Sequence, residues 1–327
     1  MTAKTIFVFT VTGDQGRSVA GILQEAGWEV TGLVRNLESE QAKALAQQGI
    51  KLVQGDLNHP ESYTKHLQGQ YAAFVNANCE PNTTDLAKRP LTHQTVFSAF
   101  ETPGMTIDKA MEIEIQQSTT AVEACAKAGV KHIVYSTLED FGGDKVVPFF
   151  TTKAKVSQHA HEKSLPVTNI RTSTYYSNVL KFQQLKPNPK TGGYYLVMQL
   201  PDDSQLTYFD VERLGDWVLA ALNDPAKYIG KDIDACSEYL TPVDIANTLS
   251  RVTGKPFETL HITKDEFYTD KNKAEASLMW PFFRAGYERY LKRDIAASRA
   301  VNPKQGTFAE WAAASKELKA AIQGKAD

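Results

Sequence analysis

Residues 5–20 read TIFVFTVTGDQGRSVA, and this stretch decides the fold. The β-branched and aromatic run 5–9 predicts a strand, and the apolar residues at 19, 22, 23 and 26 recur at helical spacing. Thr10, Gly13 and Gly16 lie between the two elements. Backbone N–H groups at a helix N-terminus attract phosphate, and glycine lets a diphosphate approach the chain. The loop therefore predicts a dinucleotide site, the alternative being an ordinary strand-to-helix turn.

The alternation of strand and helix continues outward from this loop. Further strands are predicted over 28–34, 51–54, 72–76, 132–136 and 167–171, and helices over 38–48, 60–67 and 109–128. Strands separated by helices pair in parallel through right-handed crossovers. The sequence thus predicts an α/β fold with a doubly wound parallel sheet of the Rossmann type.

The regular rhythm stops after residue 171. A strand over 194–200, a helix over 211–222, and capping-box motifs that begin at Thr241, Thr263 and Thr307 follow. This pattern predicts a second, smaller and mostly helical domain. We expect residues 1–175 to form the cofactor domain, with 206–235 returning to it, and residues 176–327 to form the substrate or partner domain.

One long segment, residues 77–108, breaks the rhythm of the first half. It follows the fourth predicted strand, at the carboxyl edge where ligands bind in such sheets. Loops of this length in a compact domain are either functional or disordered. Its apolar residues Phe97, Phe100 and Met105 favour a lid or pocket wall.

Composition excludes several classes of protein. The 327 residues carry 36 Lys+Arg against 38 Asp+Glu, so the net charge of -2 gives no general case for nucleic-acid or anionic-membrane binding. The three cysteines lack zinc or disulfide spacing, which fits a reducing compartment. No signal peptide and no apolar run of about 18 residues is recognisable. We expect a cytoplasmic protein, with the nucleus as a second location.

The end of the second strand indicates which dinucleotide is bound. It reads Leu33-Val34-Arg35-Asn36, without the acid that holds the ribose 2′-hydroxyl of NAD. Arg35, with Arg17 after the glycine loop, favours the 2′-phosphate of NADP(H), although Arg35 also suits a solvated strand end. Asp56 fits both the adenine amino group and a cap of the following helix.

These residues together resemble the NmrA-like family of atypical short-chain dehydrogenase/reductases, over nearly the whole chain. The resemblance rests on the glycine loop with Ser18-Val19-Ala20 and on a series of further motifs: 34–36, 53–56, 71–74, 134–136, 138–139, Lys153, Arg171, Tyr175, Asn178 and 225–230.

The resemblance implies a Rossmann domain that binds NADP(H), and NAD in some members. The implied cofactor contacts are Thr10, Thr12, Gly13, Asp14, Gln15, Gly16, Arg17, Arg35, Asp56, Leu57, Asn76, Asn78, Lys153, Tyr175 and Asn178. Two departures are notable. Thr10 replaces the first glycine, which we expect to loosen the tight turn, and the segment after the fourth strand is longer than usual.

Catalysis in the wider superfamily uses a serine with a Tyr-x-x-x-Lys pair. Ser136 and Lys153 match the serine and the lysine, but Phe149 stands where the tyrosine belongs and has no proton to give. Lys153 itself, Tyr175 or Tyr176 are the other proton donors that we consider. Each has a purely structural alternative: a strand end for Ser136, a surface charge for Lys153, and packing for the tyrosines.

Two functions follow from this pattern. The first is an NADP(H)-dependent oxidoreductase that reduces a small carbonyl or enone without the usual tyrosine, and the sequence favours it. The second is a non-catalytic NADPH/NADP redox sensor or transcriptional co-regulator that acts through a protein partner; a cofactor-stabilised scaffold is a third. We expect a small-molecule substrate and no direct nucleic-acid partner, and the sequence leaves the oligomeric state open.

Overall fold

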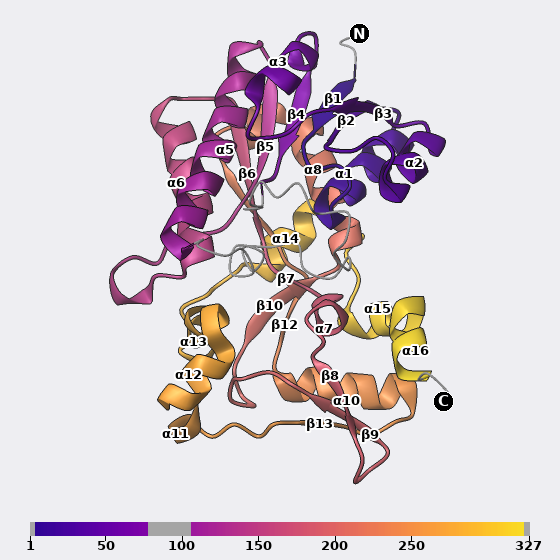
Figure 1. The fold of residues 1–327 in the computed structure, drawn as a ribbon, viewed down its shortest axis with the longest axis vertical. Helices are drawn as coiled ribbons and strands as arrows, with labels where there is room; N and C mark the ends of the chain where they lie inside the picture. Colours follow the sequence, from indigo (N-terminus) through magenta and orange to yellow (C-terminus); the bar gives the residue numbers. More distant parts are fainter. Residues whose placement is uncertain (1–3, 78–105, 324–327) are drawn as a thin grey trace. The chain divides into compact units, whose positions relative to one another are not determined.

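The computed structural model describes residues 4–77 and 106–323. The chain divides into two compact units, of which the first comprises Met1–Phe141, Pro148–Thr172 and Val211–Ala235 (Figure 1). The remainder forms the second unit.

The first unit alternates strand and helix as the sequence predicts. Its elements are β1 (Thr5–Val8), α1 (Asp14–Glu25), β2 (Glu29–Val34), α2 (Glu40–Gln47), β3 (Lys51–Gln54), α3 (Pro60–Leu67), β4 (Ala72–Val75), α5 (Ile107–Lys127), β5 (His132–Thr137), α6 (Pro148–Glu162), β6 (Val167–Thr172), η3 (Val211–Arg213), α8 (Leu214–Asn223), α9 (Pro225–Tyr228) and β11 (Asp232–Ala235).

The seven strands form one parallel sheet in the order β11-β6-β5-β4-β1-β2-β3. The order reverses between β1 and β4, which is the switch point at which such sheets leave a crevice at their carboxyl edge. The doubly wound parallel fold is therefore confirmed.

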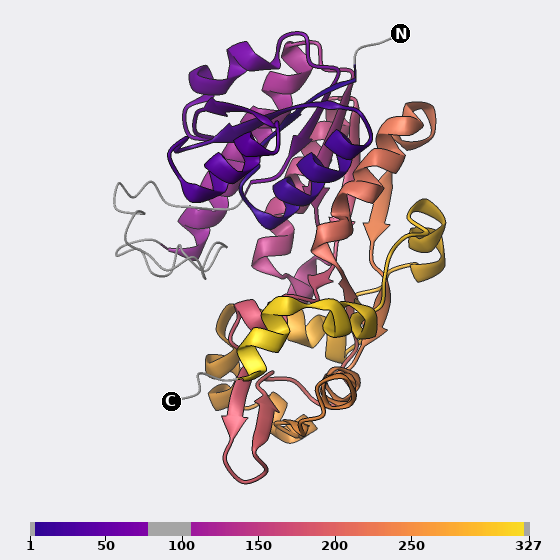
Figure 2. The ribbon, with the colours of Figure 1, turned by 90° about the vertical axis from the view of Figure 1, so that its right-hand side faces the viewer.

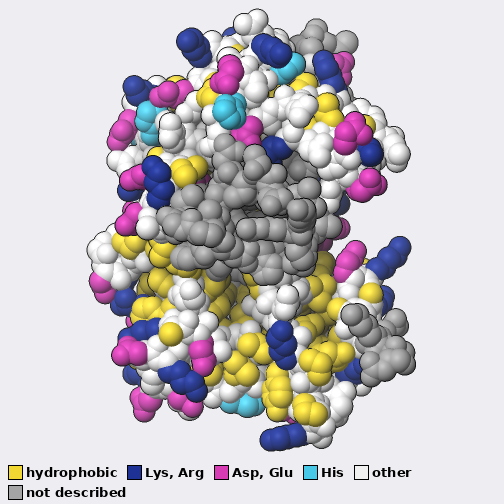
Figure 3. All heavy atoms as spheres, viewed as in Figure 1, with side chains coloured by type: hydrophobic (Ala, Val, Ile, Leu, Met, Phe, Trp, Pro, Cys, Tyr) yellow, Lys and Arg dark blue, Asp and Glu magenta, His cyan; other side chains and the backbone are white. Residues whose placement is uncertain are grey.

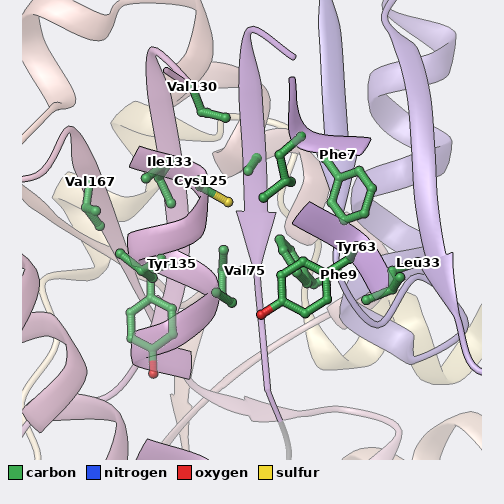
Figure 4. Packing of buried hydrophobic residues seen from close by; sticks show 14 of the residues in the cluster. Phe7, Phe9, Leu33, Tyr63, Val75, Cys125, Val130, Ile133, Tyr135 and Val167 are labelled. Atoms are coloured by element: carbon green, nitrogen blue, oxygen red, sulfur yellow. The ribbon is translucent and has the colours of Figure 1, made fainter. Parts of the chain in front are cut away.

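Helices cover both faces of this sheet. On one face α3, α5 and α6 enclose an apolar core in which Phe9 meets Tyr63 edge-on at 5.2 Å between ring centroids (Figure 4). The buried Cys125 lies in the same core, as its helical surroundings predict. On the other face α1 packs against α8 (Figure 2), and the Gly215 N–H donates to Ser18 Oγ at 3.1 Å.

The second unit combines helices with two small sheets. Its elements are η2 (Gly143–Lys145), β7 (Thr174–Tyr175), α7 (Asn178–Lys181), β8 (Leu185–Asn188), β9 (Gly193–Leu196), β10 (Leu206–Phe209), β12 (Glu238–Leu240), α10 (Pro242–Thr253), β13 (Phe257–Thr259), α11 (Lys264–Phe267), α12 (Asp270–Ala276), η4 (Ser277–Met279), α13 (Trp280–Tyr287), α14 (Ile295–Val301), α15 (Phe308–Ala314) and α16 (Lys316–Gln323).

The strands of the second unit pair in the orders β12-β10-β7 and β13-β9-β8. Because β10 pairs with β12 and β7, the segment that returns to the first unit begins at Val211 rather than at residue 206. The three predicted capping boxes, at Thr241, Thr263 and Thr307, are all present.

Candidate functional site at the carboxyl edge of the sheet

A closed turn connects β1 to α1. The Gly13 N–H donates to the Thr10 carbonyl at 2.9 Å, and Thr10 has a φ of 49°, the left-handed region that β-branched residues avoid. The expectation that Thr10 loosens this turn is therefore wrong. The turn stays tight, and the cost is backbone strain at Thr10. The Thr10 hydroxyl offsets part of this strain by donating to the Asn76 carbonyl at 3.1 Å.

Gly16 sets how closely α1 approaches this turn. A Cβ at Gly16 would lie 2.4 Å from the Thr10 carbonyl oxygen and 2.7 Å from Val11 Cα, and both of these atoms belong to the backbone. Gly13 is the N-cap of α1 and provides no side-chain cap. The first N–H groups of a helix have no intrahelical partner, so they point out of the helix end beside this turn. Such an arrangement suits an anion.

The two arginines near the loop, Arg17 and Arg35, differ in their contacts. The Arg17 guanidinium pairs with the Asp14 carboxylate at 2.8 Å and donates to the Thr12 carbonyl at 3.3 Å. Arg17 is therefore held against its own loop, which weakens the expectation of two arginines directed at one phosphate. Arg35 is exposed just after β2, and its backbone carbonyl accepts from Gln54 Nε2 at 3.0 Å.

Asp56 supports the loop between β3 and α3. One of its carboxylate oxygens accepts the Asn58 N–H at 2.7 Å, so Asp56 shapes this turn rather than capping the helix itself. The neighbouring Leu57 packs, half-buried, against the core of the first unit. The adenine contact of Asp56 stays a prediction.

Two buried polar atoms lie where β4 and β5 end. Asn76 follows β4 and is only 4% exposed, while Ser136 is the last residue but one of the neighbouring strand β5 and is 1% exposed. Neither Asn76 Oδ1 nor Ser136 Oγ has a hydrogen-bond partner among the described residues. Buried polar atoms are usually paired, and a polar ligand at this edge would pair with both of these.

Lys153 lies at this same edge. It belongs to α6, four residues after the half-buried Phe149. Lys153 Nζ donates to the Ala77 carbonyl at 3.0 Å and to Glu114 Oε1 at 2.5 Å, and its side chain is 12% exposed. The alternative of a solvated surface charge is therefore wrong.

Sequence reasoning missed Glu114, the buried partner of Lys153. A signal for it existed, because α5 presents one continuous buried stripe in which polar residues interrupt the apolar ones. The stripe consists of Ala110, Glu114, Gln117, Ser118, Ala121, Val122 and Cys125. A carboxylate on such a stripe needs a buried cation or a protonated form, since ionised groups are rarely buried unpaired.

The remaining predicted residues lie elsewhere. Tyr175, Tyr176 and Asn178 belong to the second unit. The Tyr176 hydroxyl donates to Glu238 Oε1 at 2.6 Å, and burial together with that carboxylate raises the pKa of Tyr176, so its role is packing rather than proton donation. Tyr175 packs edge-on against Phe209, and its catalytic role stays a prediction. Asn78 and most of the insert lie outside the described residues.

The described part of the chain contains no group of three or more His, Cys, Asp or Glu residues arranged to hold a metal ion. Within 4–77 and 106–323 no helix combines the length and apolar character needed to cross a membrane. On the face seen in Figure 3, basic and acidic side chains are interspersed, which matches the balanced net charge.

A parallel sheet whose order reverses beside a glycine turn and a helix N-terminus defines a Rossmann-type protein. The chain belongs to the NmrA-like family, whose model matches residues 2–319.

Two relatives in sequence and one solved structure are similar to this chain. An NmrA-like family domain-containing protein of Dictyostelium discoideum is 26% identical over 293 residues, covering 86% of this chain and 87% of the relative. The NmrA-like family domain-containing oxidoreductase himF of Aspergillus japonicus is 28% identical over 268 residues, covering 77% of this chain and 74% of the relative. The crystal structure of NmrA, a negative transcriptional regulator, in complex with NADP shares the fold with a TM-score of 0.77 and 20% identity, covering 100% of this chain and 99% of NmrA.

Proposed function

We propose that this protein binds NADP(H) at the carboxyl edge of the sheet in its first unit. The observation that carries the proposal is the turn at Thr10, Gly13 and Gly16, where no Cβ fits at Gly16 and the helix end has no side-chain cap. A diphosphate needs this close backbone approach and these outward N–H groups. NmrA, which has the same fold, is described in complex with NADP, and that description supports the assignment.

Individual residues fit the parts of the dinucleotide. The loop 10–17 would hold the diphosphate, and Arg35 would hold the 2′-phosphate. Asp56 and Leu57 would border the adenine. Asn76, just after β4, and Lys153, on α6, would hold the ribose and nicotinamide. Asn76 Oδ1 is buried without a hydrogen-bond partner among the described residues, which supports a polar ligand there.

We propose further that the protein is an oxidoreductase acting on a small organic carbonyl or enone. NADPH supplies a hydride when bound. Phe149 cannot supply the accompanying proton, so in this proposal Lys153 or Tyr175 supplies it. Ser136 would orient the substrate oxygen, because its buried hydroxyl has no partner among the described residues. Relatives such as himF are named oxidoreductases, which supports this assignment.

A second candidate is a redox sensor or transcriptional co-regulator that binds NADP(H) without turnover. The observation that favours it is the phenyl ring of Phe149 one helical turn before Lys153, together with a lysine already committed to Glu114 and Ala77. NmrA is described as a negative transcriptional regulator. A sensor of this kind acts only through different affinities of the cofactor for two states of the protein.

Calorimetry with NADPH, NADP+, NADH and NAD+ tests the binding proposal. We expect NADPH to bind most tightly, and Arg35→Ala to weaken NADPH by about tenfold or more, the equivalent of one charge-assisted hydrogen bond, while NADH changes little. Arg251→Ala, an exposed change on α10 of the second unit, is the matched control. Equal losses for NADPH and NADH would refute the choice of NADP(H), and no heat with any of the four would refute the site.

A panel of carbonyls and enones, followed by NADPH absorbance, separates the two candidate functions. We expect turnover that Lys153→Ala abolishes. Intact NADPH binding with no turnover across the panel would favour the sensor.

A further inference from the structure

We propose that Glu114 is a positioning residue that fixes the Lys153 ammonium at the edge where the cofactor binds. This inference rests on the proposed function, because it concerns how Lys153 is presented to NADP(H). Glu114 acts through Lys153, whose ammonium donates to Glu114 Oε1.

The contacts around Lys153 Nζ define one position for it. Glu114 Oε1 lies 2.5 Å away and the Ala77 carbonyl 3.0 Å away. These two acceptors take two of the three ammonium donors. Among the described residues no acceptor takes the third, which is therefore the N–H that a ligand at this edge would receive.

Glu114 is buried next to α6. Its side chain is 1% exposed, and Thr152 Oγ1 lies 3.4 Å from the same oxygen and 3.2 Å from the Phe149 carbonyl, so its single proton serves one of these two acceptors at a time. Helices α5 and α6 pack along one another, so acceptor and donor sit on neighbouring rigid elements. The Ala77 carbonyl follows β4 and thereby ties the ammonium to the strand end next to Asn76.

The free-energy balance of a buried ion pair indicates that the Glu114–Lys153 pair positions the ammonium rather than stabilises the fold. Desolvating two charges costs several kcal/mol per ion, and replacing such a pair with apolar residues is often neutral or stabilising. A lysine without this partner would sample many rotamers of its four-carbon stem, and a ligand would have to immobilise it on binding. Glu114 removes that cost in advance, which is preorganisation of the site.

The experiment is a double-mutant cycle on NADPH binding with full-length protein. The variants are Glu114→Gln, Lys153→Met and the double variant, with Glu112→Gln as the control on the same helix. Glu112 is exposed and pairs with Lys109 at 3.3 Å, so its change removes an equal charge outside the site. Calorimetry gives the dissociation constant, and thermal unfolding of the cofactor-free proteins reports on folding.

We expect Glu114→Gln to weaken NADPH binding by about tenfold in the wild-type background. In the Lys153→Met background the same change is expected to have no effect, because there is no ammonium left to position. A purely structural role of Glu114 would weaken binding equally in both backgrounds and would overturn the inference. Unchanged binding by Glu114→Gln would overturn it as well.

Two further outcomes are distinguishable. If Glu114→Gln does not fold, Glu114→Asp replaces it in the cycle, since a shorter carboxylate keeps the charge but draws the ammonium back, and the same background dependence is required. Wild-type protein that binds no NADPH would refute the proposed function and the inference with it, whereas tight binding by both wild type and Glu114→Gln refutes the inference alone.

Discussion

Replacing Gly16 by alanine, which adds one methyl group, is the most direct single-residue test of the proposed site. In Gly16→Ala the new Cβ would meet the backbone of Thr10 and Val11 at 2.4–2.9 Å, and these atoms cannot rotate away. We expect the loop to shift, at a cost of about 1–3 kcal/mol in the free energy of unfolding. NADPH binding should fall sharply, because the diphosphate depends on the same backbone. Urea unfolding and calorimetry measure the two effects.

Gly21 on the same helix is the control for this change. A Cβ there meets nothing within 4 Å, so Gly21→Ala should leave NADPH binding unchanged and raise stability by up to about 1 kcal/mol through helix propensity. If Gly16→Ala binds NADPH as Gly21→Ala does, the loop is an ordinary turn and not a phosphate site.

The sequence predicted which residues lie at the carboxyl edge of the sheet better than it predicted which side chains pair with one another. Ser136, Asn76 and Lys153 all lie at the carboxyl edge of the sheet, as their places after strands or in α6 predict. Sequence alone did not show that Arg17 is taken by Asp14 or that Lys153 is taken by Glu114. The Lys153–Glu114 pair depends on how α5 and α6 pack side by side. The Arg17–Asp14 pair is local, three residues apart on α1, and such spacing permits an ion pair without requiring one.

At the level of elements, β5 and β6 are joined by a buried polar chain. His132 Nε2 lies 2.7 Å from Thr168 Oγ1, and that hydroxyl donates to the Tyr228 carbonyl at 2.7 Å. The Thr168 hydroxyl has one proton, which it donates to the Tyr228 carbonyl. His132 Nε2 therefore carries a proton and donates it to Thr168 Oγ1. Nδ1 is buried without a partner among the described residues, and a second proton there would have no acceptor. Burial accordingly lowers the pKa of His132 to about 4.

This lowered pKa predicts a loss of stability in mild acid. The unfolded chain takes up a proton near the usual value of 6.5, and the folded chain only near 4, so the free energy of unfolding falls as the pH drops from 6.5 to 4. The pKa difference corresponds to at most about 3 kcal/mol. Urea unfolding at pH 7, 5.5 and 4.5 measures this loss.

His132→Gln is expected to remove this component while keeping a donor for Thr168. His161→Gln, an exposed change at the end of α6, should keep the wild-type pH dependence. Parallel pH profiles for wild type and His132→Gln would contradict the assignment.

Elements with strong local signals were predicted with their bounds. The strand 51–54 and the helix 60–67 were correct, because a turn and a proline set their limits. The helix predicted from residue 38 begins instead at Glu40, since Ser39 is its N-cap and Asn36 forms a turn before it. The strand predicted over 194–200 ends at Leu196, where its pairing with β8 and β13 ends. The end of this strand depends on a partner distant in the sequence, β13, whereas the start of the helix has a local signal at Ser39.

At the scale of the molecule, the sequence predicted a doubly wound sheet and a returning segment over 206–235, but not where that return begins. β11 extends the sheet beside β6, and Arg171 Nε donates to Asp234 Oδ1 at 2.8 Å across that pair. The same returning segment contains Gly215, where a Cβ would lie 2.6 Å from the Ser18 carbonyl of α1. Contacts over nearly 200 residues have no periodic signal, so only the structure shows where the return begins.

Hydrogen exchange with and without NADPH tests which segments of the chain the cofactor protects. At roughly 100 times the dissociation constant, bound cofactor stabilises the folded state by about 2.7 kcal/mol, so amides that open with the site should exchange more slowly. We expect protection in the loop 10–17, at the end of β4 and, because Tyr175 and Asn178 match family cofactor contacts, in β7 and α7. The capped helix α10 has no predicted contact and serves as the internal control. Protection of the loop without any change in β7 and α7 would remove Tyr175 and Asn178 from the site and leave Lys153 as the proton donor of the proposed reaction.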